Sequence, residues 1–375
     1  EGTATRTSRQ IAEQLAEIGG ALSANAGPDT FVVSGNALAE NTSILLDLLA
    51  DVSIRASFPE DELQIFKSRR LQELLAERSD AAFWADDKIA ASVFGSHPYA
   101  RTNPTPESIE KVNREVLAGF RDKMLAPNNA VLLLLGALPP RAQTLDLIKA
   151  RFGEWARREV PAPPAPEFPK SERSILMVDR PGSVQADIRI GQLAIDRLNP
   201  DYFPMVVANT ILGGGASSRL FMNIREAKGF AYDARSFMSP RRNAGLFTVY
   251  TQVRNEVIGQ ALEAIEQELH TLASTPAPAQ DLARVKNFLS GNFVMSLETQ
   301  NGLAAQFSNV KLMGLPNDYL EFYTTRVRSV EPPQILDVAK KYMSPEDACF
   351  VVVGDASKLR PALEKYGKVT TVKAE

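Results

Sequence analysis

Residues 211–232 read ILGGGASSRLFMNIREAKGFAY. Three consecutive glycines, beginning at Gly213, let the backbone turn where a side chain would clash. Ser217 or Ser218 then stands where a serine can cap a helix. We expect this helix to end at Gly229, because glycine suits the left-handed position just past a helix C-terminus. The stretch therefore predicts a tight turn, a helix and a second turn.

Arg225 and Tyr232 are the candidate functional pair of this stretch. Arg225 lies on the last turns of the predicted helix, and Tyr232 follows seven residues later (232 − 225 = 7), near the start of a strand predicted over residues 231–237. A guanidinium and a phenol brought together there can both donate to one carbonyl oxygen as it gains negative charge. The spacing alone equally fits a surface arginine beside a half-buried tyrosine.

Composition excludes several classes of protein. The 375 residues are 44% hydrophobic and 23% charged, which is ordinary for a soluble globular chain of two domains. A net charge of −3 gives no basic surface for nucleic acid or anionic membrane, and no apolar run is long enough to span a bilayer. Cys349 is the single cysteine, so an internal disulfide and a multi-cysteine metal site are excluded. We expect it to be a small buried hydrophobic residue.

The chain reads as two copies of one α+β module. Phe31 and Glu40, which lead into a leucine-rich helix, parallel Phe247 and Glu256 at one offset (247 − 31 = 256 − 40 = 216). Residues 130–138 form an apolar run that predicts a buried strand. Hairpins, consecutive helices and a returning strand favour a mixed or antiparallel sheet with helices packed on one face of each module.

The proline-rich run VPAPPAPEFPKS marks a linker between the modules, because proline cannot donate to a sheet and favours extended structure. We predict a first domain over residues 1–159, a linker over 160–171 and a second domain over 172–375. The chain begins with Glu1 rather than methionine and shows no signal peptide, so we expect residues to precede it.

The stretch 211–232 resembles the second-domain signature of M16 metallopeptidases, the family of pitrilysin, insulinase and mitochondrial processing peptidase. That signature has the form S-S-R-L-F-x-x-[IL]-R-E-x-K-G-[LF]-A-Y after a glycine-rich turn, and nearly every position is met here. Segments of the first half, near Gly2 and near His97, also resemble that family. The resemblance implies two homologous domains that are joined by a linker and enclose substrate between them. It also implies that the first domain lacks its first strand and its zinc-motif helix here.

The resemblance implies a zinc site that this sequence does not contain. M16 peptidases hold zinc with a helical His-x-x-Glu-His motif and a further glutamate downstream. The only histidines, His97 and His270, lie far apart and outside such a motif, so we expect no metal in this chain. Glu73 matches the position of the downstream zinc ligand, but the sequence fits equally well with Glu73 as a solvated surface residue. Phe66 stands seven residues earlier, where active members often carry a second acid.

These departures favour a non-catalytic subunit. In bacterial members built from two different chains, one subunit resembles the zinc peptidase and the other contributes an Arg and a Tyr. By that resemblance, Arg225 would bind the scissile carbonyl of an extended peptide, and Tyr232 would donate to the oxyanion opposite the zinc of the partner chain. The partner would be a catalytic M16 subunit in a heterodimer, with self-association as the other arrangement.

Two alternatives stay open. The first is a truncated chain of an active M16 zinc endopeptidase, with the zinc held by a segment before Glu1. The second is a scaffold or peptide-binding subunit that does no proteolysis. The compartment is also open, with the bacterial periplasm as one candidate, because many relatives of the non-catalytic type carry export signals.

Overall fold

The computed structural model describes residues 2–374. Glu1, whose acidic side chain adds to the resemblance to non-catalytic members, lies outside the described residues. Two compact units divide the chain: unit 1 comprises residues 2–75, Pro104–Pro163 and Leu297–Leu312, and unit 2 comprises Ala76–Asn103, Pro164–Ser296 and residues 313–374. Each unit is described by itself.

Unit 1 is mainly helical. It contains α1 (Ser8–Glu17), β1 (Ala21–Ala26), β2 (Phe31–Asn36), η1 (Ala39–Asn41), α2 (Thr42–Ile54), most of α3 (Glu60–Arg78), α5 (Pro106–Glu110), α6 (Arg114–Met124), η3 (Pro127–Asn129), α7 (Arg141–Phe152) and α11 (Gln300–Leu312).

Unit 2 contains the large sheet. Its elements are α4 (Ala81–Phe94), η2 (Pro98–Ala100), β3 (Ser174–Asp179), β4 (Gln185–Ala194), α8 (Tyr202–Gly213), η4 (Phe221–Ala227), β5 (Ala231–Pro240), β6 (Gly245–Arg254), η5 (Asn255–Val257), α9 (Ile258–Ser274), α10 (Ala279–Ser296), α12 (Tyr319–Arg328), α13 (Pro332–Tyr342), η6 (Pro345–Asp347), β7 (Cys349–Gly354), α14 (Ala356–Leu363) and β8 (Val369–Lys373).

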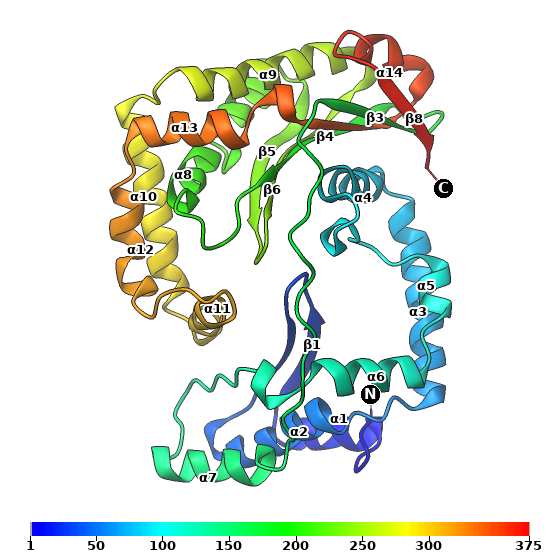
Figure 1. Cartoon of the computed structure of the whole chain (residues 1–375), viewed down its shortest axis with the longest axis vertical. Helices are drawn as coiled ribbons and strands as arrows, with labels where there is room; N and C mark the ends of the chain where they lie inside the picture. Colours follow the sequence, from blue (N-terminus) through cyan, green and yellow to red (C-terminus); the bar gives the residue numbers. More distant parts are fainter. Residues whose placement is uncertain (1, 375) are drawn as a thin grey trace. The chain divides into compact units, whose positions relative to one another are not determined.

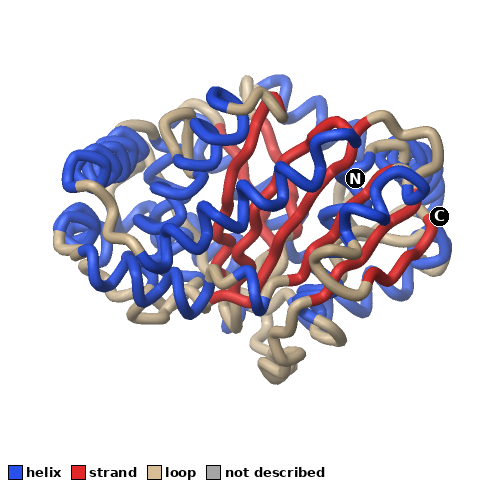
Figure 2. Tube along the Cα trace, turned by 90° about the horizontal axis from the view of Figure 1, so that it is seen from above, coloured by secondary structure: helices blue, strands red, loops and turns tan. Residues whose placement is uncertain are grey.

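The sheet of unit 2 is mixed, with the strand order β5-β6-β4-β7-β3-β8 (Figure 2). The pairs β5/β6, β6/β4 and β4/β7 are antiparallel, whereas β3 runs parallel to both β7 and β8. β4 is buried along nearly its whole length because it is central in the sheet and covered on both faces. The α+β class with a mixed sheet is confirmed.

Helices cover the two faces of this sheet unequally (Figure 1). α8, α9 and α13 pack over the main core, and α9 buries an amphipathic stripe with the i, i+3, i+4 spacing of a core-facing helix: Ala261, Leu262, Ile265, Leu269 and Leu272. On the other face, α4 packs against β4 and β7 with Trp84, Ile89 and Val93 in a second cluster. The sequence predicted helices on one face, and α4 adds cover to part of the second.

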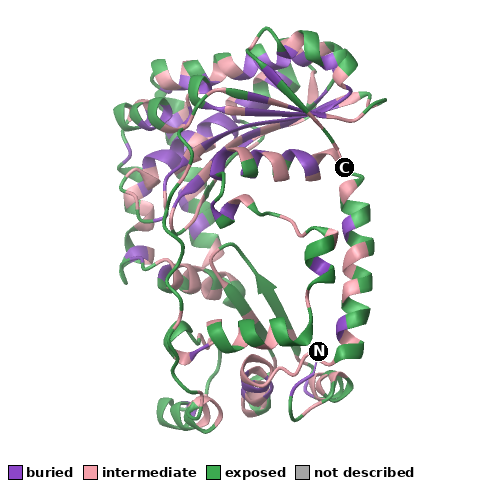
Figure 3. Cartoon of the chain, turned by 45° about the vertical axis from the view of Figure 1, so that its right-hand side comes forward, coloured by how far each residue is buried: buried purple, intermediate pink, exposed green. Residues whose placement is uncertain are grey.

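Unit 1 has a thinner core. Its sheet is the antiparallel hairpin β1–β2, which is mostly exposed on both faces (Figure 3). Its packing depends on a few helix residues such as Leu46, Leu48 and Leu74. The first residues of the unit are tied to α2 through buried Asp51, which accepts hydrogen bonds from the Thr3 hydroxyl at 2.6 Å and from Arg6 at 2.7 Å.

The prediction of a strand over residues 130–138 is wrong. Ala130 is extended, but no residue of 130–138 pairs in a sheet within the described part of the chain. Its counterpart in unit 2 is β7, which follows η6 as residues 130–138 follow η3, and β7 lies between β3 and β4. Among residues 2–374, no strand lies beside residues 130–138 as β3 and β4 lie beside β7.

The predicted internal repeat is visible in the element boundaries. η1 and η5 begin 216 residues apart (255 − 39 = 216), and so do α2 and α9 (258 − 42 = 216). This is the offset that the sequence repeat predicted. In both modules a short 3₁₀ helix, η1 or η5, leads directly into the long helix.

Residues 160–171 are in neither helix nor strand, and Phe168 packs into the core cluster around α4. Within residues 2–374, no helix combines the length and apolar character that crossing a membrane requires.

Candidate functional site

The glycine turn of the predicted site serves a close approach between helix and strand. α8 ends at Gly213, and a Cβ atom there would lie 2.1 Å from the backbone nitrogen of Ser236 on β5. A Cβ atom on Gly214 would lie 2.6 Å from the Cα of Thr210. Gly213, Gly214 and Gly215 all have ordinary negative φ values, so it is space rather than a left-handed backbone that requires glycine at the first two positions.

The serine cap predicted after this turn is not formed. The Ser218 hydroxyl is buried without a hydrogen-bond partner, and the Ser217 hydroxyl is bound by the Arg284 guanidinium of α10. Arg284 also donates to the Ser217 carbonyl at 3.2 Å. The turn is thus held from a neighbouring helix, which sequence spacing does not reveal.

The helix that carries Arg225 is a π-helix, η4. The Lys228 amide donates to the Asn223 carbonyl at 3.1 Å, which is the i+5 bond of that geometry. The helix ends as predicted: Gly229 has φ +61°, and the Phe230 amide donates back to the Ile224 carbonyl at 3.0 Å. π-helical turns occur frequently at functional sites.

Arg225 points away from the core of unit 2. Phe221 and Ile224 bury the inner face of η4, whereas the Arg225 side chain is 46% exposed. Its guanidinium carbon lies 4.7 Å from the centre of the Phe221 ring, and its Nε lies 3.5 Å from a carboxylate oxygen of Glu226. The Phe221 ring holds the guanidinium by a cation–π contact, and the N–H donors of the guanidinium stay accessible to a ligand.

Tyr232 is the second residue of β5 and is 87% exposed. The pairing of β5 with β6 is irregular here: Ala231 lies opposite Val253, but Ala234 lies opposite Thr251. Tyr232 and Asp233 together face the single residue Gln252, which is the arrangement of a β-bulge. Because bulges redirect side chains, the phenol stands out from the sheet edge. Arg225 and Tyr232 thus present donors from η4 and β5, which pack against each other.

The residue after Tyr232 joins a polar network that the sequence reading missed. The Asp233 carboxylate accepts from Arg235 Nε at 2.7 Å and from the Tyr250 hydroxyl at 2.9 Å. Burial and the hydrogen bond to Asp233 raise the pKa of Tyr250. The available signal was the alternation of charges at positions 233 and 235 within a predicted strand.

The network continues onto β4 and α4. Arg189 lies 5.5 Å from the centre of the Tyr250 ring, contacts Asp187, and donates to Asp86 at 2.6 Å. Burial disfavours its charge, but the hydrogen bond to Asp86 and the charge of Asp187 outweigh burial and raise the pKa of Arg189. Arg189 is therefore a cation held inside the sheet face.

The residues expected near a zinc site do not form one. Glu73 on α3 is half exposed and lies 3.7 Å from Arg69 and 3.4 Å from Arg70, as a surface acid would. His97 is buried, its Nδ1 accepts from the Tyr99 amide at 3.2 Å, and its other nitrogen has no partner; His270 pairs with Glu346 at 3.3 Å. Across residues 2–374, no group of three or more His, Cys, Asp or Glu side chains could hold a metal ion. The donor set in this part of the chain does not fit zinc.

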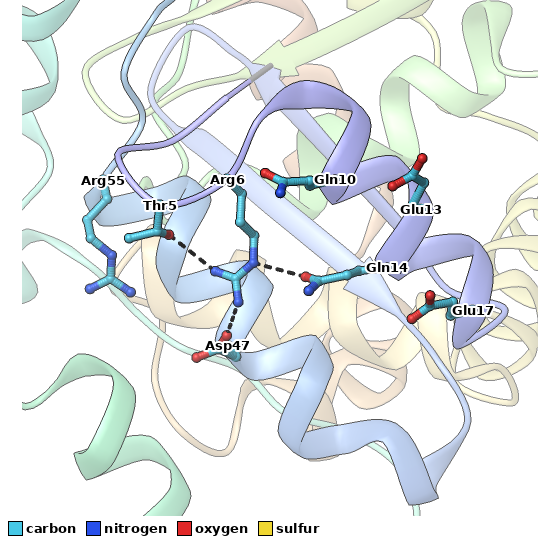
Figure 4. A pocket seen from close by; sticks show the side chains of 8 residues that line it. All are labelled: Thr5, Arg6, Gln10, Glu13, Gln14, Glu17, Asp47 and Arg55. Atoms are coloured by element: carbon cyan, nitrogen blue, oxygen red, sulfur yellow. Dashed lines mark hydrogen bonds and ion pairs between the residues drawn. The ribbon is translucent and has the colours of Figure 1, made fainter.

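A polar cavity of about 640 Å³ lies in unit 1 (Figure 4). Its lining residues are Thr5, Arg6, Gln10, Glu13, Gln14, Glu17, Asp47 and Arg55. Arg6 crosses the cavity and donates to Gln14 at 2.9 Å and to Asp47 at 2.5 Å. Its charge is matched by Asp47 and by Asp51 beneath it, so we interpret this arginine as a structural tie between α1 and α2.

Family comparisons identify both halves of the chain. The family model described as insulinase (peptidase family M16) matches residues 1–106, and the model described as peptidase M16 inactive domain matches residues 111–289. An uncharacterized zinc protease, YmxG, of Bacillus subtilis is 23% identical over 361 residues, covering 96% of this chain and 87% of that protein. An uncharacterized zinc protease of Rickettsia bellii is 27% identical over 301 residues, covering 80% of this chain and 71% of its own length.

Solved structures agree on the fold. A crystal structure of a peptidase M16 inactive domain from Pseudomonas fluorescens superposes with a TM-score of 0.87 at 24% identity, covering 95% of this chain and 86% of that one. A protease from Helicobacter pylori gives a TM-score of 0.84 at 17% identity, with coverages of 94% and 86%. Together with the glycine turn, η4 and the start of β5, these matches lead to one conclusion: the chain belongs to the M16 peptidase family.

Proposed function

We propose that this chain is the non-catalytic subunit of a two-chain M16 zinc peptidase and supplies Arg225 and Tyr232 to the site of a partner that carries the HxxEH motif. The observation that carries the proposal is the exposure of two donors, 46% for Arg225 and 87% for Tyr232, on elements that pack against each other. At 87% exposure, the Tyr232 ring contributes little to the core of unit 2. Two similarities support this division of work: the relatives are named zinc proteases, and the family model that matches residues 111–289 describes an M16 inactive domain.

In this proposal the two side chains act on one carbonyl of an extended peptide. The Arg225 guanidinium donates to the carbonyl oxygen and orients the peptide, since its planar fork offers several donors. The Tyr232 phenol donates to the same oxygen as it becomes an oxyanion, when the hydrogen bond strengthens. The metal of the partner chain would supply the activated water. This chain provides orientation and charge stabilisation.

Complementation tests the proposal. The partner would be captured from native extract with this chain as bait and identified by its HxxEH motif. We expect each chain alone to leave a quenched fluorescent, unstructured peptide intact, and the mixture to cleave it. A zinc chelator should abolish cleavage by the mixture without changing the thermal unfolding of this chain alone.

Two results would count against the proposal. Full activity of this chain alone, with HxxEH found by intact mass and peptide sequencing before Glu1, would make it an active peptidase. Assembly with a partner and peptide binding without cleavage would make it a scaffold or peptide-binding subunit.

A further inference from the structure

The β-bulge at Tyr232 and Asp233 is fixed to β6 at two places. The Asp233 carbonyl accepts from the Thr251 hydroxyl at 2.7 Å, and its carboxylate accepts from the Tyr250 hydroxyl at 2.9 Å. Thr251 is 1% exposed, so its bond is shielded from water. Both the backbone and the side chain of Asp233 are therefore tied to consecutive residues of the next strand.

This attachment bears directly on the neighbouring phenol. Tyr232 is 87% exposed, so packing of its own ring does little to fix its direction. The backbone on either side, where Ala231 pairs with Val253 and Asp233 is tied to β6, sets the direction in which the side chain leaves the strand. A donor that must meet an oxyanion gains most when its position is fixed before the substrate arrives.

Asp233 also governs the charge beside Arg225. The guanidinium carbons of Arg225 and Arg235 lie 4.7 Å and 5.1 Å from the centre of the same Phe221 ring. Two cations at one ring repel each other, and Arg235 is paired with Asp233 at 2.7 Å. Arg225 has its own carboxylate neighbour, Glu226, but at the longer distance of 3.5 Å, so Arg225 is the less tightly paired of the two cations.

We infer that Asp233 is a positioning residue of the proposed site: it fixes the bulge that presents Tyr232 and neutralises Arg235 beside Arg225. The inference rests on the proposed function. Asp233 itself does not contact the substrate. Its role predicts that variants which release the bulge lower kcat through Tyr232.

Three substitutions each remove one tie and keep the size of the side chain. Asp233→Asn removes the charge, Tyr250→Phe removes the bond to the carboxylate, and Thr251→Val removes the bond to the carbonyl. In the reconstituted pair we expect Asp233→Asn and Thr251→Val to lower kcat about tenfold with KM changed by less than about twofold, because a small misplacement of a catalytic group is costly.

The matched controls are Thr251→Ser and Asp337→Asn. The first keeps the hydroxyl that holds the Asp233 carbonyl, and the second makes the same acid-to-amide change on an exposed residue of α13. Both should keep kcat close to that of the unsubstituted pair. Hydrogen exchange at amides 231–234 should rise in Thr251→Val and not in Thr251→Ser.

A double-mutant cycle with Tyr232→Phe decides the matter. If the bulge acts through Tyr232, Thr251→Val should lower kcat far less in the Tyr232→Phe background than in the unsubstituted chain. A general structural role predicts the same fold loss in both backgrounds, and that result would overturn the inference. If Tyr232→Phe has no effect by itself, the proposed function fails and the inference fails with it. If Tyr232→Phe lowers kcat as expected but the effect of Thr251→Val is additive with it, the positioning role is rejected and the proposed function stands.

Discussion

At the scale of single residues, Asp51 shows how a buried charge ties the start of the chain to α2. Its side chain is fully buried and is bound by the Thr3 and Thr5 hydroxyls and by Arg6 and Arg55. Burial alone would raise its pKa, but these hydrogen bonds outweigh burial and lower the pKa of Asp51 to about 2. The charged form is thus favoured in the folded state.

This predicts a pH-dependent cost for Asp51→Asn. Because the folded pKa lies below the unfolded value of about 3.9, the stabilisation of about 2 kcal/mol is complete above pH 5 and is lost as the pH falls towards 2. Urea unfolding should show the Asp51→Asn variant to be less stable than the unsubstituted chain at pH 7, with the difference shrinking by about 1 kcal/mol at pH 3. A difference that stays constant between these pH values would contradict the account.

For single residues, the sequence predicted backbone conformations better than it predicted side-chain contacts. Gly229 was predicted at a left-handed helix end and has φ +61°. The predicted serine cap is absent, and Arg284, 67 residues after Ser217 (284 − 217 = 67), holds this turn. Asp233 was missed since its partner Tyr250 is set by strand register, which one sequence does not give.

At the scale of elements, the approach of α8 to β5 depends on Gly213. A Cβ atom there would meet backbone 2.1 Å away, and backbone cannot move aside cheaply. Overpacked core sites typically cost about 1–3 kcal/mol. We predict that Gly213→Ala lowers the free energy of unfolding of unit 2 by about this amount or more. Urea unfolding measures this difference.

Gly291→Ala on α10 is the matched control. A Cβ atom on Gly291 would meet nothing within 4 Å, and the position is inside a helix. Alanine should stabilise there by about 0.5–1 kcal/mol through its higher helix propensity. Equal effects of the two substitutions would show that propensity, and not the close approach, decides the cost at Gly213.

Elements that depend on distant partners could not be read from local pattern. η4 has an ordinary helical sequence but forms a π-helix, and it packs against β5 and α9, which are distant in the sequence. Residues 130–138 have the composition of a strand, but in the part of the chain that the structure describes no strand pairs with them as β3 and β4 pair with β7. Strand formation requires pairing, so apolar composition was insufficient.

At the scale of the molecule, the sequence repeat predicted the plan of both units. The offset of 216 reappears in the starts of α2 and α9, because each long helix follows a hairpin through the same short turn. The two units nevertheless differ in what they bury. Unit 2 has a six-stranded sheet between two clusters, and unit 1 has a two-stranded hairpin.

This difference predicts unequal stability. Hydrogen exchange under native conditions should protect β4 and β7 more strongly than β1 and β2, because buried sheet amides open only with large-scale unfolding. Mass spectrometry of exchanged peptides resolves the four strands. Equal protection of the hairpin and the central strands would show that the exposed hairpin is held by contacts beyond its own pairing.

The most direct measurement is the turnover of the reconstituted pair when this chain carries Arg225→Ala or Tyr232→Phe. We predict that Tyr232→Phe lowers kcat about a hundredfold, as loss of one oxyanion donor does, while the two chains still assemble. Arg225→Ala should lower kcat/KM by a similar factor, with Asp337→Asn as the unaffected control. Turnover at the unsubstituted rate in both variants would contradict the claim that this chain supplies catalytic donors to its partner.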